Sequence, residues 1–369
     1  MQKKQVAVLD IGSSKITAVV GERGINKTFN LKCDSAFEYD GFIEGAFINT
    51  DSLKRALFSA VECVRKAFHG EEFVLYVGVP AAFTSVVVKN SQISFPKSKK
   101  ITEADVESLY SAAFVISSTK HTIINRSPII YELSDSRRVM QCVGEESEVL
   151  KGVLSFVLCD NVFMNTVKSF LKAAGISETE FVSASLAEAM YLIDAEVRDR
   201  MAIILDVGYI STSLSIVQGD GLIFEQAFDF GGGYITAAIS EKFDIGFGEA
   251  EKLKRKVNLS RVSAKSALDV IDGGNGEYYS LDELRDNVKM SIEGLCEMIA
   301  NCLEGCKISV PEYVPIMITG GGISYIRGAC EHMANRLGCM VEVLAPAVPL
   351  MDEPTKASEL SLVDIALKQ

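Results

Sequence analysis

Two similar hydrophobic patterns lie about half a chain apart. An apolar run leads into Asp10-Ile11-Gly12-Ser13-Ser14, and a second apolar run follows over 16–20. Much later another apolar run leads into Asp206-Val207-Gly208, and its companion follows over 213–217. Short apolar runs bounded by turn residues are typical of buried strands. Each pattern therefore predicts a β-hairpin with a carboxylate and a glycine in its turn, and the repeat predicts two halves facing a shared cleft.

Two glycine triplets interrupt later apolar runs. Gly320-Gly321-Gly322 ends a strand expected over 315–319 and precedes a helix expected over 324–337. Gly231-Gly232-Gly233 separates a strand expected over 222–228 from another helical pattern. Glycine lets the backbone approach a ligand, and a helix N-terminus presents unpaired N–H groups to anions. Both triplets thus favour an anion-binding site.

Helical periodicity organises much of the remaining chain. Residues 51–68 and 281–306 predict amphipathic helices. Between about 74 and 173, short strands are expected to alternate with helices, and Thr102 with Asp105 predicts a capping box. The predicted division is a first half over 1–73 and 174–204, an inserted small α/β subdomain over 74–173, and a second half over 205–369.

Composition narrows the class of protein. The chain is 48% hydrophobic and 23% charged, which is ordinary for a folded protein. Its net charge of −12 argues against broad contact with nucleic acid or anionic lipid. No apolar stretch approaches the ~20 residues that span a bilayer, and no apolar signal segment opens the chain. We expect a cytoplasmic protein with no nucleic-acid partner and no direct membrane insertion.

The nine cysteines show no metal-binding spacing. None forms a CxxC pair, and although Cys302 and Cys306 share a predicted helix face, a metal cluster needs more convergent ligands. Cys330 and His332, two residues apart, likewise supply too few ligands for a metal site. Free cysteine behaves as a small apolar residue, so buried, reduced thiols are expected.

Together, the hairpins and the glycine turn predict a nucleotide site. A bound nucleoside triphosphate needs backbone N–H groups around its phosphates, carboxylates for hydrated Mg²⁺ and an apolar wall for its base. One Asp-x-Gly turn indicates only a tight turn. Two such turns followed by Thr319 and a glycine triplet, in this order, predict binding of ATP with Mg²⁺.

At this point the motifs resemble the superfamily of actin, sugar kinases and heat-shock chaperone ATPases. Within it, the chain most closely resembles the bacterial cell-division FtsA family, whose first loop, DIGTSKI, is similar to residues 10–16. Residues 101–106 resemble the first helix of that family's extra subdomain, 230–236 its GGxxIT segment, and Ala250-Glu251-x-x-Lys254 its AExxK helix. The resemblance implies an α/β, actin-like (ribonuclease H-like) two-domain fold with an inserted small α/β subdomain.

The resemblance also implies roles for individual residues. Asp10 and Asp206 would hold Mg²⁺ through water. The remaining nucleotide-binding residues that it implies are Gly12, Ser13, Ser14 and Lys15 at the phosphates, Gly208 and Gly232 on the opposite wall, Glu251 and Lys254 at the ribose or base, and Gly320, Gly321 and Gly322 around adenosine. From the residues alone, Lys15 is equally a solvated turn lysine, and Glu251 with Lys254 a surface ion pair.

Three departures from the family pattern limit what the resemblance implies. Tyr209 and Ile210 stand where the second phosphate loop usually has glycines. Residues 184–187 read Ala-Ser-Leu-Ala where related proteins often carry a Glu-Pro whose carboxylate orients water. FtsA-type proteins usually end in an amphipathic membrane helix, and no such pattern is found in the residues up to Gln369. We therefore expect ATP binding with weak or absent hydrolysis, at most a weak ATPase.

The sequence leaves three functions open. The leading interpretation is an ATP-binding scaffold of bacterial cell division that forms filaments with itself, recruits a tubulin-like division protein, or both, and reaches the division site through a partner. The inserted subdomain, with Lys97-Ser98-Lys99-Lys100, is the candidate docking surface. The alternatives are a pilus-assembly adaptor of the PilM type and a small-molecule kinase. A kinase needs a catalytic base aimed at a substrate hydroxyl, and no Asp or Glu stands in a distinctive motif for it.

Overall fold

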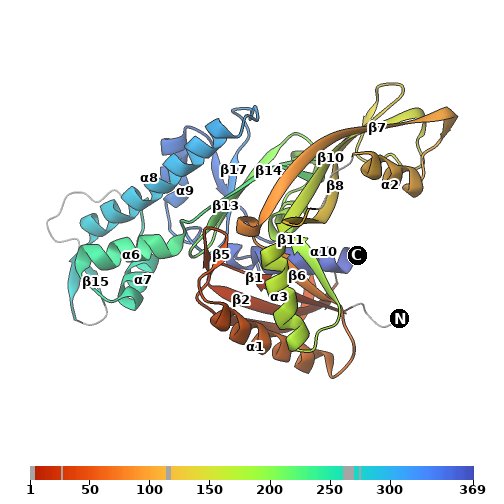
Figure 1. Ribbon diagram of the computed structural model, residues 1–369. Helices are drawn as coiled ribbons and strands as arrows, with labels where there is room; N and C mark the ends of the chain where they lie inside the picture. The colour runs from red at the N-terminus through yellow and green to blue at the C-terminus, as the bar shows by residue number, and fades with distance from the viewer. Residues whose placement is uncertain (1–4, 26–27, 114–117, 261–269, 274–275) are drawn as a thin grey trace.

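The computed structural model describes residues 5–25, 28–113, 118–260, 270–273 and 276–369. Two five-stranded sheets share one plan, β11-β6-β1-β2-β3 and β14-β13-β12-β17-β18 (Figure 1). The strands of the first are β1 (Gln5–Ile11), β2 (Lys15–Arg23), β3 (Phe29–Glu38), β6 (Leu75–Val79) and β11 (Thr179–Ser183). Those of the second are β12 (Ala202–Val207), β13 (Thr212–Gln218), β14 (Gly221–Phe228), β17 (Ile316–Thr319) and β18 (Val341–Val343).

Strand register places the two aspartates at equivalent positions. In the first sheet, Asp10 pairs with Thr17 on the antiparallel β2, and in the second, Asp206 pairs with Ser213 on the antiparallel β13. On its other side β1 runs parallel to β6, as β12 runs parallel to β17. Both hairpins predicted from the sequence are confirmed, and each carries its aspartate near the carboxyl end of a buried strand.

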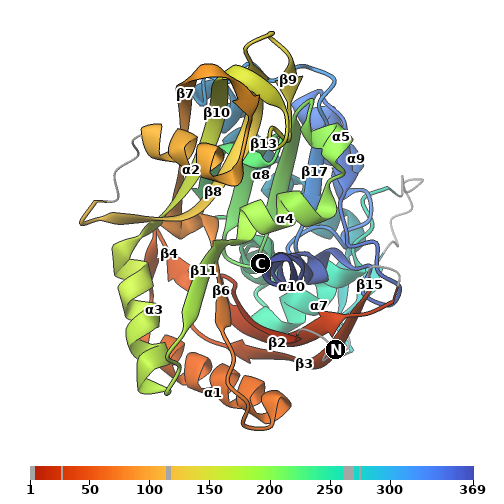
Figure 2. The same cartoon turned by 90° about the vertical axis from the view of Figure 1, so that its right-hand side faces the viewer.

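Helices cover both faces of the first sheet. On one face lie α1 (Thr50–Phe68), whose N-terminus is capped by Asn49, and α3 (Asn161–Ala173). The other face holds α10 (Ala357–Lys368), which packs against β1 and against α4 (Ala184–Leu192). Leu186 and Ala189 of α4 also contact the core beside Ile204 of β12. Figure 2 shows α4 between the two sheets, next to α10.

The second half has its own helical layer. Its core contains apolar residues of α6 (Gly232–Phe243), α7 (Phe247–Lys256), α8 (Leu281–Gly305) and α9 (Ala329–Leu337). Short elements elsewhere in the described residues include β4 (Phe42–Ile43), β5 (Ala46–Phe47), α5 (Ala195–Arg198), β15 (Val270–Asp272), β16 (Tyr278–Ser280) and the 3₁₀ helices at Ala81–Phe83 and Pro354–Lys356. The helix expected from Ser324 begins only at Ala329, because bends, turns and an isolated β-bridge between Arg327 and Asn258 occupy 323–328. The expectation that this helix directly follows the glycine triplet is therefore wrong.

The inserted segment forms a third sheet, with α2 (Glu103–Ala112) packed against it (Figure 1). Thr102 and Asp105 form the predicted capping box. Long strands replace the expected alternation of short strands and helices, in the order β7-β10-β8-β9. Their bounds are β7 (Thr84–Lys100), β8 (His121–Leu133), β9 (Arg138–Val139) and β10 (Glu146–Asp160).

Some segments pack across the predicted domain limits. Strand β6 and helix α3 fall inside 74–173, yet β6 belongs to the first sheet and Phe163 of α3 lies in that sheet's core. The part that builds its own sheet is therefore 84–160. Similarly, α10 falls inside 205–369, but its Leu360 and Val363 pack with Val8 of β1. The division into domains stays a proposal, with these segments assigned to the first half.

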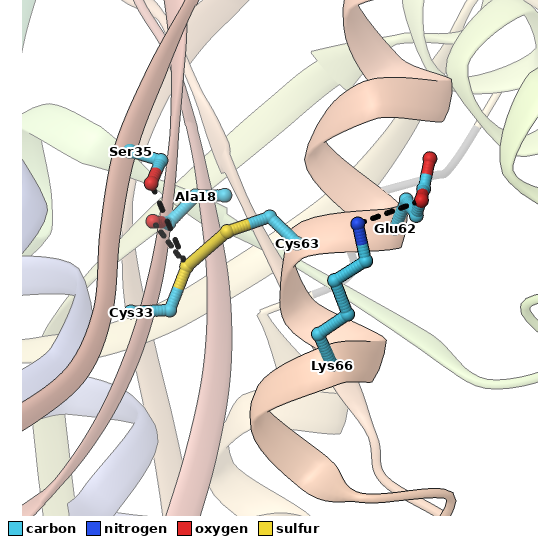
Figure 3. Close-up of a disulfide and its surroundings, with 6 residues drawn as sticks. All are labelled: Ala18, Cys33, Ser35, Glu62, Cys63 and Lys66. Atoms are coloured by element: carbon cyan, nitrogen blue, oxygen red, sulfur yellow. Dashed lines mark hydrogen bonds and ion pairs between the residues drawn. A yellow bond between two sulfur atoms is a disulfide. The ribbon is translucent and has the colours of Figure 1, made fainter.

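The thiol prediction is wrong for one pair. Cys33 on β3 and Cys63 on α1 form a disulfide (Figure 3), with their Cα atoms 7.0 Å apart. Because α1 lies across β2 and β3, it brings together cysteines that stand 30 residues apart. The other seven cysteines are free and buried or partly buried, as expected. Within the described parts of the chain, no helix combines the length and the apolar content needed to cross a bilayer.

Candidate nucleotide-binding cleft

A cavity of about 670 Å³ lies where the two hairpin turns meet. This volume suits a small organic ligand. Most of the predicted site residues line it, namely Asp10, Gly12, Ser13, Ser14, Lys15, Asp206, Gly208, Glu251, Gly320 and Gly321. The fold thus brings into one cavity residues from both halves that are separated by most of the chain.

The two aspartates form the acidic centre of the cavity. Burial raises the pKa of Asp10 to about 6, although a hydrogen bond from the Ser358 hydroxyl, 3.0 Å from Oδ1, and the charge of Lys15 oppose the shift. Burial, and then the charge of Asp10, raises the pKa of Asp206 to about 7. Two neighbouring carboxyl groups with raised pKa values are poorly compensated by cations.

The negative charge of these two carboxyl groups, which few nearby cations compensate, favours the binding of a hydrated divalent cation. Mg²⁺ keeps several of its waters and is usually held by one or two carboxylates together with substrate phosphates. Among the described residues, no three His, Cys, Asp or Glu side chains converge closely enough to hold a metal ion directly. Asp10 and Asp206 therefore suit contact with Mg²⁺ through water rather than a cage of protein ligands.

The two turns are hydrogen-bonded to each other. Gly12 N–H donates to the Lys15 carbonyl at 2.9 Å, and Gly208 N–H donates in the same way to the Ser211 carbonyl at 2.9 Å. The Ser13 Oγ then accepts from the backbone N–H groups of Ile210, at 3.1 Å, and of Ser211, at 3.4 Å. Two backbone N–H groups of the second turn thus donate hydrogen bonds to a side-chain oxygen of the first turn. The same N–H groups could instead donate to a phosphate oxygen.

The side chains of Tyr209 and Ile210, the two bulky residues of the second turn, point toward different parts of the molecule. Tyr209 lines the cavity, and its ring meets Phe247 edge-on with centroids 6.4 Å apart. The Ile210 side chain instead packs against the turn at Gly41, where an added Cβ would lie 2.8 Å from Ile210 Cδ1. Neither side chain fills the cavity, but Ile210 helps to hold the second turn against the first half.

Comparison with known proteins agrees with this architecture. A family model described as "Type IV pilus assembly protein PilM" matches residues 172–270. The cell division protein FtsA of Buchnera aphidicola subsp. Baizongia pistaciae (strain Bp) is 21% identical over 365 residues, covering 92% of this chain and 85% of that protein. A chain of the PilM–PilN type IV pilus biogenesis complex aligns with a TM-score of 0.64 and 18% identity, covering 100% of both chains. MreB5 of Spiroplasma citri bound to ADP aligns with a TM-score of 0.55 and 11% identity, covering 98% of this chain and 95% of that chain.

The chain has the actin-like fold. Its sequence also resembles FtsA along nearly its whole length, as the motifs indicated.

Three predicted residues lie behind the wall of this actin-like cleft. Lys254 is only 1% exposed, and its Nζ lies 2.7 Å from both the Gly232 carbonyl oxygen and Glu251 Oε2. Burial lowers its pKa, while Glu251 opposes the shift. Gly232 and Gly322 pack so closely that a Cβ on Gly232 would lie 2.7 Å from the Gly322 carbonyl oxygen. The lysine therefore joins α7 to α6, and these two glycines allow close backbone packing rather than lining the cleft.

The actin-like cleft contains one residue at its Glu251 end, Arg255, that the sequence analysis missed. Arg255 lines the cavity and bonds through Nε to Glu251 Oε1 at 2.9 Å. Its guanidinium lies 4.9 Å from the centre of the Tyr325 ring. The buried Tyr325 hydroxyl has no hydrogen-bond partner among the described residues. Tyr325 lines a separate hollow beside Arg255. A guanidinium plane can stack on a nucleobase, and the available signal was the arginine directly after Lys254.

The second missed residue of the cavity carries a carboxyl group. Glu188 of α4 lines the cavity but is only 2% exposed. Its pKa is raised well above the usual value, first by burial and then by the charges of Asp206, Asp10 and Glu225. The available signal was its position one helical turn beyond Ala184, because residues four apart share a helix face.

Proposed function

We propose that this protein is an ATP-binding, actin-like scaffold of bacterial cell division that works with Mg²⁺. The observation that carries the proposal is the meeting of Asp10, Asp206 and the Gly320 turn in one cavity between two similarly built halves. Similarity to FtsA over most of the chain supports the division role. The structure of MreB5 of Spiroplasma citri bound to ADP supports a nucleotide as the ligand of this fold.

Each part of the cleft has a role in this proposal. Asp10 and Asp206 would hold the hydrated Mg²⁺, which neutralises phosphate charge. Ser13, Ser14 and Lys15, with the backbone N–H groups of the second turn, would contact the phosphates. Glu251 would bond the ribose or base, and the Arg255 guanidinium would stack on the base. Because these groups come from both halves, ATP would stabilise their closed arrangement and favour self-assembly or binding of a tubulin-like partner.

A direct test is a thermal-shift titration with ATP and Mg²⁺. A ligand that binds only the folded state stabilises it in proportion to the logarithm of its concentration above Kd. We expect this behaviour for the wild-type protein and for the control Glu62→Gln, which alters an exposed carboxylate on α1. Asp10→Asn should show little shift. Absence of any shift at millimolar ATP for the wild-type protein would refute nucleotide binding.

A pilus-assembly adaptor is the second candidate function. It is favoured by the PilM family model over 172–270 and by the similarity to a chain of the PilM–PilN complex. The two functions differ in the partner rather than in the cleft. Affinity capture with the wild-type protein and with Asp10→Asn, each with and without ATP, separates them. Capture of a tubulin-like protein supports the division role, and capture of a pilus-assembly protein supports the adaptor.

A further inference from the structure

Ser358 lies on the first turn of helix α10 and lines the nucleotide cavity. Its hydroxyl donates a hydrogen bond to Oδ1 of Asp10 at 3.0 Å, across a sequence separation of 348 residues. No sequence motif marked this serine. The proposed function gives Asp10 a role at the metal and leaves Ser358 without one.

A second serine on the same helix shows the usual alternative for such a hydroxyl. Ser361 Oγ donates to the Ala357 carbonyl oxygen at 2.6 Å, the bond that serine hydroxyls commonly make to the carbonyl four residues earlier in a helix. Ser358 instead donates out of its helix to a carboxyl group on β1. A hydrogen bond to a charged acceptor is roughly twice as strong as one between neutral groups. The Ser358 hydroxyl therefore joins α10 to the site rather than to its own backbone.

Neighbouring contacts hold Ser358 in place. Lys356 Nζ lies 2.6 Å from Asp34 Oδ2 on β3, and this ion pair fastens the start of α10 to the first sheet. Leu360 is fully buried and packs in one core cluster with apolar residues of β1. Because contacts on both sides fix this helical turn, the hydroxyl approaches Asp10 from a defined position.

The segment before Ser358 also contacts the second half. The Thr319 hydroxyl donates to the Pro354 carbonyl oxygen at 3.4 Å, just before the glycine turn that follows β17. Pro354 and Thr355 line the cavity together with Ser358. This segment therefore reaches from the glycine turn of the second half to the aspartate of the first half.

Orientation matters for a carboxylate that holds a metal ion through water. The terminal torsion of an aspartate side chain is broad, so a hydrogen bond to one carboxylate oxygen restricts a rotation that ligand binding would otherwise have to restrict. Carboxylates that bind metals are usually hydrogen-bonded in turn, and loss of such a partner typically weakens metal binding by about 10- to 100-fold. A hydroxyl group is neutral, so it restrains Asp10 without cancelling the charge that attracts Mg²⁺.

We propose that Ser358 is a positioning residue for the metal-holding carboxylate of Asp10, an inference that rests on the proposed binding of Mg²⁺-ATP. Its hydroxyl holds Oδ1, so that the carboxylate meets the hydrated Mg²⁺ in a fixed orientation. The effect of Ser358 passes through Asp10 and the metal, and it therefore applies to Mg²⁺-ATP and not to metal-free ATP.

The test compares nucleotide binding with and without metal on the full chain. We expect Ser358→Ala to weaken Mg²⁺-ATP by about tenfold in titration calorimetry, and to change the affinity for ATP in EDTA by less than about twofold. Ser358→Thr keeps the hydroxyl and should bind Mg²⁺-ATP within about threefold of the wild-type affinity. Ser361→Ala is the matched control, because it removes a serine hydroxyl from the same helix without removing a bond to Asp10. It should leave both affinities within about twofold of the wild type.

A double-mutant cycle tests whether the effect passes through Asp10. In an Asp10→Asn background, adding Ser358→Ala should weaken Mg²⁺-ATP by less than about twofold, because the carboxylate that Ser358 positions is already gone. A further loss of about tenfold in that background would place the role of Ser358 elsewhere, and the inference would be wrong.

The other results also have defined meanings. If Ser358→Ala binds Mg²⁺-ATP as tightly as the wild type, or loses affinity equally with and without metal, the inference is wrong and the proposed function stands. The same conclusion follows if Ser361→Ala weakens Mg²⁺-ATP as much as Ser358→Ala does, since packing of α10 would then explain both losses. If the wild-type protein binds no nucleotide, both the function and the inference fail.

Discussion

The turn after β1 and the turn after β12 begin alike and end differently. Each has an aspartate near the end of its strand, and each closes with a glycine N–H that donates to a carbonyl three residues later. The first continues with the small residues Ser13 and Ser14, and the second with Tyr209 and Ile210. Consequently Ser13 reaches across and accepts hydrogen bonds from the second turn. The two turns have equivalent backbones, but the first supplies a side-chain acceptor and the second supplies backbone N–H donors. The side chains that follow each glycine therefore determine which hydrogen-bonding groups a ligand can contact.

The two halves differ also in how their sheets are held. The first half contains the disulfide between Cys33 and Cys63, and helix α10 returns to it from the end of the chain. Ser358 of α10 bonds to Asp10. In the described part of the second half, Asp206 has no such hydroxyl partner and lies instead against the Gly320 turn. The first aspartate is therefore positioned by a hydrogen bond and the second by close backbone packing.

The largest effect should come from filling the space beside Asp206. Gly320 has φ of +82°, and a Cβ there would lie 2.1 Å from Asp206 Oδ1. Backbone strain and the steric overlap should together lower the free energy of unfolding of Gly320→Ala by about 4 kcal/mol. Gly144 is the matched control, since its φ is +92° and no atom lies within 4 Å of the added Cβ. Urea denaturation measures both, and equal losses would show that packing around Asp206 is looser than described.

Removing the covalent link should weaken the first half alone. The disulfide closes a loop of 30 residues in sequence separation, so Cys33→Ser should lose about 3 kcal/mol under oxidising conditions. Cys302→Ser, a change at a free and partly buried cysteine of the second half, should cost less. Thermal unfolding with and without dithiothreitol checks this. A wild-type melting temperature that does not respond to the reductant would indicate that the pair contributes no stability.

Neutralising the two aspartates should separate their contributions to binding. Asp10→Asn should weaken Mg²⁺-ATP by about 100-fold, or about 2.8 kcal/mol, with little change in the stability of the ligand-free protein. Asp206→Asn should weaken it by about tenfold. Thermal-shift titration of both variants measures the difference. If Asp10→Asn lowers the melting temperature equally with and without nucleotide, Asp10 is a structural turn residue.

The ligand-free protein should lose stability as the pH rises. The folded state raises the pKa of Asp10 to about 6 and that of Asp206 to about 7, so it binds these protons more tightly than the unfolded chain does. The resulting stability is fully present below the ordinary aspartate pKa and is lost as the pH rises through the two raised values. Allowing for water in the cleft, the loss between about pH 5 and pH 8 should be about 2 kcal/mol. Urea denaturation across this range should show a shallower loss for a variant with both aspartates changed to asparagine.

Making the second turn more like the first should have the smallest effect. Ile210→Gly removes the side chain that packs at Gly41 and gives the N–H of residue 210 more freedom to turn toward a phosphate. We expect about threefold tighter binding of Mg²⁺-ATP, less than about 1 kcal/mol, with Ile210→Ala in between. Titration calorimetry can resolve such differences. Weaker binding by the glycine variant would show that the contact with Gly41 holds the turn in its binding conformation.

Local sequence patterns were sufficient for several elements and for much of the site. Periodicity predicted α1 and α8 nearly to their ends, and the spacing of Thr102 and Asp105 predicted the cap of α2. The two Asp-x-Gly motifs placed Asp10 and Asp206 in equivalent turns. These predictions succeeded because a strand, a turn or a helix start is specified by residues within a few positions of each other.

Other features were decided only when distant segments packed together. Lys254 shares the local motif of Glu251, but the approach of α6 to α7 buries it behind the cleft wall. Glu188 belongs to no recognisable sequence motif. It faces the cleft because α4 packs between the two sheets. The hydrogen bonds from Ile210 and Ser211 to Ser13 join residues almost 200 positions apart. The sequence by itself determined which chemical groups stand in the turns, whereas tertiary packing determined which of them face the cavity, since that depends on the surface against which each helix or turn is packed.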